Sequence, residues 1–180
     1  MSSTRLPVLE KFIADLRTIW SAEADNHRRM ERAKPLLEQL VKDAGLKAHS
    51  ASWPSTEGYK NLLLYVDPDH HFVINAVVRA PGRTGSVHDH ADAWVLYGVL
   101  DGSESLERYE RIDDGSRPGY AEVGSPRSRP ARKARSIWWR RAPFTPSRAA
   151  QRAQWRSSSA VNVWAKGRCY NTPTIPRRKP

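Results

Sequence analysis

Two histidines separated by one residue, His88 and His90, are the residues whose type and spacing point most directly to chemistry. Side chains alternate between the two faces of an extended strand, so residues i and i+2 point the same way. Two imidazoles on one face can share a divalent metal ion, and imidazole suits zinc, iron, copper and nickel alike. The pair therefore predicts a metal site, with two surface histidines before a turn as the alternative interpretation.

Glycines frame this pair, with Gly82 six positions before His88 and Gly102 after the apolar run 93–100. The frame resembles the first metal motif of the cupins: a glycine, five residues, HxH, three or four residues, a glutamate, six residues and a glycine. The glutamate position falls on Trp94 or Val95, so that ligand is absent. A cupin with histidine ligands and no glutamate is similar to the thiol dioxygenases, the cysteine dioxygenase family and its bacterial relatives, and the resemblance covers about residues 57–112.

The resemblance implies a non-haem iron dioxygenase that binds Fe(II), or another divalent metal, and uses O2 to oxidise a small thiol carboxylate such as cysteine or a related mercapto acid. Other cupins with similar ligands are lyases, isomerases or ring-opening dioxygenases, and these remain alternatives. A non-catalytic, truncated cupin with a basic tail is the alternative from another functional class.

Four further residues are candidates for substrate binding. In the resembling family a strand arginine pairs with the substrate carboxylate, and the matching position here is Lys60. Lysine offers a point charge in place of a bidentate fork, so anchoring would be looser. Arg79, just before the histidine segment, is a second candidate for an anionic group, and a solvent-facing surface role is the alternative for both Lys60 and Arg79. Trp94 and Tyr97 are candidates for the walls of a pocket, with a role in the core as the alternative.

A third metal ligand is missing from the sequence. Catalytic sites ordinarily use three protein ligands and keep positions open for substrate. The resembling family carries its third histidine on a later strand, whereas all six histidines of this chain lie at or before position 90. If the chain is complete as printed, we expect weak metal binding and little or no activity.

Charge is distributed unevenly along the chain. Residues 1–123 hold 15 Lys and Arg and all 19 Asp and Glu, a net charge of −4, whereas residues 124–180 hold the other 15 basic residues and no acidic one. We therefore divide the chain into N-terminal helices (1–50), a cupin β-barrel part (51–123) and a basic, irregular tail (124–180).

A change of reading frame would explain both the charge change and the missing ligand. Tryptophan has the single codon TGG, so Trp138-Trp139 fixes part of the coding DNA. Read two nucleotides downstream, the codon spanning Phe144-Thr145 encodes tyrosine or histidine. With GC-rich codons, residues 134–150 can read as EVDLVAPRAIHAEQGG, a strand-like sequence with a histidine. We hypothesise that the native cupin sequence ends near Val123. The alternatives are a disordered basic tail and, as the least favoured, a nucleic-acid-binding tail with interleaved tryptophans.

Hydrophobic periodicity predicts a mostly β fold, the cupin double-stranded β-helix or jelly roll, preceded by two α-helices. Apolar residues recur at helical spacing from Leu6 to Trp20, and a second helix is expected over about 22–44, with Pro35 as a possible kink. Strands are expected at 59–66, 72–79, 93–100 and 104–112, with turns at Asp67-Pro68-Asp69 and Asp101-Gly102-Ser103.

The length of 180 residues fits one domain. No apolar run approaches the ~20 residues of a membrane span. The single cysteine, Cys169, excludes an internal disulfide. We therefore expect a cytoplasmic protein without a membrane partner, and we expect nucleic acid not to be its partner.

Overall fold

Three helices form one layer of the molecule. The computed structural model describes residues 6–56, 61–88, 90, 93–117, 120–125, 127–132, 136–139 and 149–165. The helices are α1 (Pro7–Ala22), α2 (Asn26–Leu40) and α3 (Ala44–Ser50). The Asp25 carboxylate accepts a hydrogen bond from the Arg28 N–H and the Asp43 carboxylate one from the Leu46 N–H, which caps α2 and α3. Two helices were expected; the Asp43 cap starts a third where the second was expected to end.

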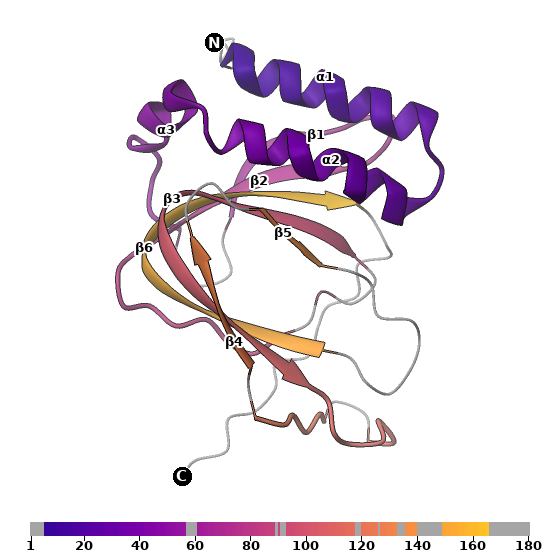
Figure 1. Ribbon diagram of the computed structural model, residues 1–180, viewed down its shortest axis with the longest axis vertical. Helices are drawn as coiled ribbons and strands as arrows, with labels where there is room; N and C mark the ends of the chain where they lie inside the picture. Colours follow the sequence, from indigo (N-terminus) through magenta and orange to yellow (C-terminus); the bar gives the residue numbers. More distant parts are fainter. Residues whose placement is uncertain are drawn as a thin grey trace.

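An antiparallel sheet forms the second layer, and its strands are listed here in chain order: β1 (Leu62–Val66), β2 (Val73–Arg79), β3 (Trp94–Glu110), β4 (Arg127–Arg132), β5 (Ser136–Trp139) and β6 (Ala149–Ala165). The strand order is β1-β2-β6-β3-β4, and β5 also pairs with β3. The helices cover one face of this sheet, as Figure 1 shows. The predicted fold class, mostly β with N-terminal helices, is confirmed.

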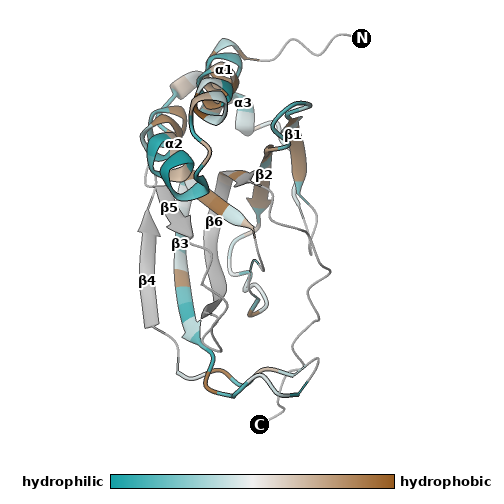
Figure 2. Ribbon diagram, turned by 90° about the vertical axis from the view of Figure 1, so that its right-hand side faces the viewer, coloured by the Kyte–Doolittle hydropathy of each residue, from teal (hydrophilic) through white to brown (hydrophobic). Residues whose placement is uncertain are grey.

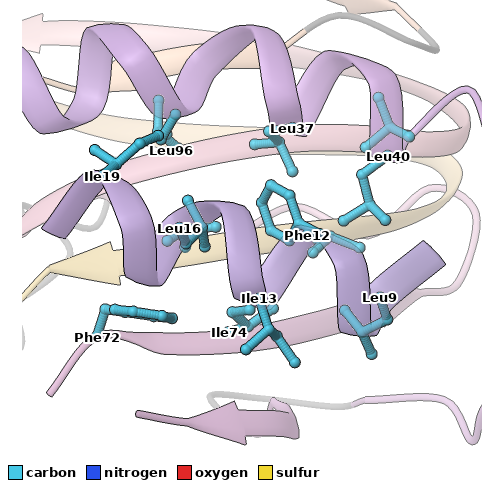
Figure 3. Close-up of a cluster of buried hydrophobic side chains, with 14 of the residues drawn as sticks. Leu9, Phe12, Ile13, Leu16, Ile19, Leu37, Leu40, Phe72, Ile74 and Leu96 are labelled. Atoms are coloured by element: carbon cyan, nitrogen blue, oxygen red, sulfur yellow. The ribbon is translucent and has the colours of Figure 1, made fainter. Parts of the chain in front are cut away.

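The main hydrophobic core lies between the helices and the sheet. Its centre is formed by Leu16 of α1, Leu37 of α2, Phe72 before β2 and Leu96 of β3, all fully buried (Figure 3). Burial of such side chains is the main favourable contribution to folding, about 1.5–3 kcal/mol for each large apolar residue. Figure 2 shows that the helices cover only one end of the long strands and that the far end of β3 is hydrophilic.

The C-terminal part of the chain differs from the expected irregular tail. Three strands lie within 124–165, and β6 occupies the position between β2 and β3. Ala160, Val161 and Val163 of β6 are buried, and Val161 and Val163 belong to the core under the helices. This short alternation of apolar residues is a strand signal that the basic composition of the region conceals.

A turn was expected at Asp101-Gly102-Ser103, but β3 continues through it from Trp94 to Glu110. The strand pairs with β6 on both sides of this segment, with register shifts between Val99 and Asp101 and between Gly102 and Ser103. Gly102 has a φ of 81°, a conformation that glycine adopts without strain and that β-bulges use. The glycine therefore marks a bulge instead of a hairpin turn.

None of the helices in the described part of the chain is long and apolar enough to cross a membrane.

Candidate metal and substrate site

The structure brings the two predicted metal ligands together. The ring centroids of His88 and His90 are 5.2 Å apart, and their planes are nearly perpendicular, at 89°. Both residues are half-buried. Nδ1 of His88 lies 2.9 Å from the backbone carbonyl oxygen of Ser86. A carbonyl oxygen only accepts hydrogen bonds, so Nδ1 is the donor, and in the neutral imidazole Nε2 then keeps its lone pair for a metal. A hydrogen bond of this kind orients most metal-binding histidines.

The donor set fits a transition metal, but it is incomplete. Within the described residues, no third His, Cys, Asp or Glu joins the pair in a group that could hold a metal ion. Asp89 and Asp92 lie outside the described residues, as does the whole region between β5 and β6, residues 140–148. The two imidazoles therefore form part of a site whose remaining ligand the described residues do not supply.

The histidines lie on a connection that must return along the sheet. β2 and β3 both pair antiparallel with β6, so they run in the same direction. Residues 80–88, 90 and 93, the described part of the connection from β2 to β3, lie on the side of the sheet away from the helices (Figure 1). We call this side of the sheet the inner face, and it carries Val95, Tyr97 and Val99 of β3.

Arg79, a predicted substrate-binding residue, is held at the end of β2 by Thr56. Nη1 of Arg79 donates to the backbone oxygen of Thr56 and, at 2.6 Å, to its hydroxyl oxygen. Thr56 is itself fixed on β2, because its N–H donates to the Val78 oxygen at 2.8 Å and its hydroxyl accepts from the Val78 N–H at 2.9 Å. Burial lowers the pKa of Arg79 below its ordinary value, and electrostatic interactions with Tyr97 and Glu104 oppose that shift. Arginine remains charged in such surroundings.

Tyr97, the predicted pocket residue, contacts a carboxylate that the sequence did not single out. Its hydroxyl donates a hydrogen bond to Oε1 of Glu104, whose residue is only 3% exposed. Arg79, Tyr97 and Glu104 thus form one cluster, which we call the inner polar cluster, of a cation, a phenol and a buried carboxylate.

The bulge in β3 explains why Glu104 was missed. Tyr97 and Glu104 are seven positions apart, so strict alternation puts them on opposite faces. In the structure Leu100 lies in the core under the helices, and the next residue, Asp101, forms an ion pair with Lys47 of α3 at 3.1 Å. Two consecutive residues therefore point towards the helices, and the alternation reverses beyond them. The reversal brings Glu104 to the face of Tyr97.

The two remaining candidates lie elsewhere. Trp94 is on the helix-covered face, where it packs against the core and its ring lies 6.0 Å from that of His27. The structure therefore separates Trp94 from Tyr97. Lys60 lies outside the described residues, and its role in binding a carboxylate stays a prediction.

Comparison with solved structures finds proteins of similar fold. No protein-family model matches the chain. One similar solved structure is a hydroquinone 1,2-dioxygenase in complex with Cd²⁺ and 4-hydroxybenzonitrile, with a TM-score of 0.44, 12% identity and coverage of 73% of this chain and 77% of that one. Another is the cupin domain of Schizosaccharomyces pombe Cnp3, with a TM-score of 0.43, 11% identity and coverage of 65% and 71%. A third is an oxalate oxidase in complex with glycolate, with a TM-score of 0.41, 19% identity and coverage of 63% and 53%.

Proposed function

We propose that this chain carries the site of a metal-dependent cupin enzyme in which His88 and His90 bind a divalent metal. The arrangement of the two rings, 5.2 Å apart with His88 oriented by the Ser86 carbonyl, is the observation that carries the proposal. Fe(II) is the first candidate, because imidazole ligands with open positions suit non-haem iron. The cupin resemblance of the HxH segment supports the same metal class.

The proposed reaction is the oxidation of a small thiol carboxylate by O2. Bound Fe(II) would polarise and orient both reactants at its open positions. The side chains of the protein bind the substrate and exclude water from the site. Arg79, fixed by Thr56, offers its guanidinium to the substrate carboxylate, and this fork geometry suits a bidentate contact. The buried side chains of Val95 and Val99 give the same face of β3 an apolar surface.

A complete site requires a third ligand, and the reading-frame hypothesis supplies one. In a chain with the shifted frame after residue 123, the codon spanning Phe144-Thr145 encodes tyrosine or histidine, and a histidine there would be the third ligand. The chain as printed has two described ligands, and we expect it to bind metal weakly and to turn over little substrate. We place the enzyme in the cytoplasm, where Cys169 stays reduced.

Oxygen consumption tests the reaction. Both versions of the chain are supplied with Fe(II) without air and then mixed with O2 and either 3-mercaptopropionate or cysteine. We expect oxygen uptake by the version with the restored frame, and no uptake with propionate or alanine, which lack the thiol. Arg79→Gln should raise KM about tenfold or more, since a charge-assisted contact is lost, and should change kcat less.

A restored chain that holds one iron and consumes no oxygen with either thiol would overturn the assignment. Uptake with a substrate without a thiol would favour one of the other cupin dioxygenases.

A further inference from the structure

The two edges of the sheet differ in how well they are protected against pairing with another strand. Among the described residues, β4 forms one edge of the sheet and β1 the other. An edge strand leaves backbone N–H and C=O groups open, and proteins commonly protect such strands with charged residues and proline. β4 has the sequence RSRPAR, whereas β1, LLLYV, contains no charged residue and no proline. β1 is therefore the open edge, and Figure 2 shows it as an apolar strand, coloured brown.

A bulge in β1 places its two exposed side chains on the same face of the sheet. Leu63 pairs with Asn75 of β2 and, beyond a register shift, Val66 pairs with Val73. Asn75 and Val73 flank Ile74, which lies in the core under the helices, so they and their partners in β1 lie on the inner face. In a regular strand, residues three positions apart point to opposite faces, so the bulge is what brings Leu63 and Val66 together. Leu63 is 66% exposed and Val66 49%, and the two side chains form an apolar strip along the open edge.

We propose that β1 pairs antiparallel with β1 of a second copy of this chain, across a two-fold axis perpendicular to the sheet. Each copy then presents the same backbone groups to the other, and the two sheets continue into one. The axis keeps the inner faces of both copies on the same side. The exposed apolar side chains of one copy therefore lie beside those of the other and are removed from water.

The absence of charge in β1 favours a second copy over a partner of another sequence. Partners are distinguished largely by charged residues that attract the correct one or repel a wrong one, and β1 offers none for a different chain to recognise. Two copies of β1 meet without like-charge repulsion, whereas the three arginines in the sequence of β4 disfavour such pairing at the other edge. Because only one edge is open, the pairing closes at a dimer and does not continue into a filament.

Sedimentation equilibrium of the full chain at micromolar concentration tests the dimer. β1 precedes residue 123, so the printed chain and the chain with the restored frame should both form it. We expect a dimer that dissociates on dilution, and no larger species. Leu63→Lys removes an apolar contact in each copy and adds like charges, so it should weaken the dimer about tenfold or more.

Ile112→Lys is the matched control. Ile112 is 62% exposed, about as much as Leu63, but it follows the end of β3, and its N–H donates to the Glu122 backbone oxygen. This substitution removes an exposed apolar side chain of the same size and should leave the dissociation constant unchanged. If Leu63→Lys does not fold, as judged by circular dichroism, Val66→Lys makes the same test on the same face.

Hydrogen exchange of the unaltered chain shows where the two copies meet. The amides of β1 should exchange more slowly as the concentration rises through the dissociation constant, because N–H groups at the open edge gain partners. Those of β4 should not change.

A chain that stays monomeric at every concentration would overturn the proposal, and so would a dimer that a folded Leu63→Lys variant leaves intact. Growth beyond a dimer, or slower exchange elsewhere but not in β1, would also overturn it. None of these measurements involves metal or substrate, so their failure would leave the proposed iron site and its reaction untouched.

Discussion

Asp67 is a fully buried carboxylate that joins α1 to the turn between β1 and β2. It accepts hydrogen bonds from Nη1 of Arg17 at 2.6 Å, the Tyr65 hydroxyl at 2.9 Å and the His70 N–H at 2.7 Å. Burial alone would raise the pKa of Asp67, but these hydrogen bonds outweigh it and hold the pKa below its usual range. His70 and His71, which follow Asp69, thus belong to a structured turn, as the sequence Asp67-Pro68-Asp69 predicts.

Replacement of Asp67 should make stability less dependent on pH. A carboxylate with a lowered folded-state pKa contributes stability above its unfolded pKa of about 4, and this contribution is lost as the pH falls towards the folded pKa. We expect Asp67→Asn to lower the free energy of unfolding by about 2–3 kcal/mol at pH 7. The difference from the unaltered chain should shrink below about pH 4.

Urea unfolding at several pH values between 7 and 3 measures this difference. Asp113, whose pKa Arg111 holds low, titrates in both proteins and cancels. Asp15→Asn, in an exposed pair with Lys11, is the control and should cost less than about 1 kcal/mol. A difference that is constant from pH 7 to pH 3 would show that the charge of Asp67 is not what stabilises the turn.

At the scale of elements, close contact between α2 and β3 depends on a glycine. A Cβ added to Gly98 would lie 2.8 Å from Cγ1 of Val41 and 3.1 Å from Cγ of Leu37. Such distances are too short for carbon atoms, so any side chain at this position pushes the end of α2 away from the sheet. In the sequence Gly98 interrupts an apolar run, which does not reveal that a helix crosses at that point.

We expect Gly98→Ala to destabilise the fold by about 1–3 kcal/mol through overpacking. Val41→Ala in the same chain removes the methyl group that the new Cβ would meet. The double variant should therefore lose less stability than the sum of the two single variants, which chemical denaturation of all four proteins measures. Strict additivity would mean that the two positions do not press on each other.

The elements that local pattern determines were predicted, and those that depend on distant pairing were not. The apolar spacing from Leu6 to Trp20 predicted α1, and the β-rich segments 59–66 and 72–79 predicted β1 and β2. The sequence predicts a turn at Gly102, where the structure has a bulge. An Asp-Gly pair occurs in both turns and bulges, and only the pairing of β3 with β6 decides between them. Glu104 was missed for the same reason.

For the whole molecule, the main surprise is that β6 fills a central position of the sheet. A basic composition without acidic residues suggested a tail, whereas the pairing of Ala149–Ala165 with β2 and β3 is a long-range property that composition does not report. The rings of His88 and His90 lie next to each other, and the charge of Arg79 interacts with Tyr97. The binding roles of these residues, the third ligand and the reading-frame hypothesis all stay predictions.

The most direct test of the account is the metal content of the purified protein, measured by elemental analysis after supply with Fe(II). The proteins compared are the chain as printed, the chain with the restored frame, and each with His88 and His90 replaced by alanine. We expect close to one iron per chain in the restored protein, much less in the printed chain and none in either alanine variant. Equal iron with and without the two histidines would contradict the central claim that His88 and His90 hold the metal.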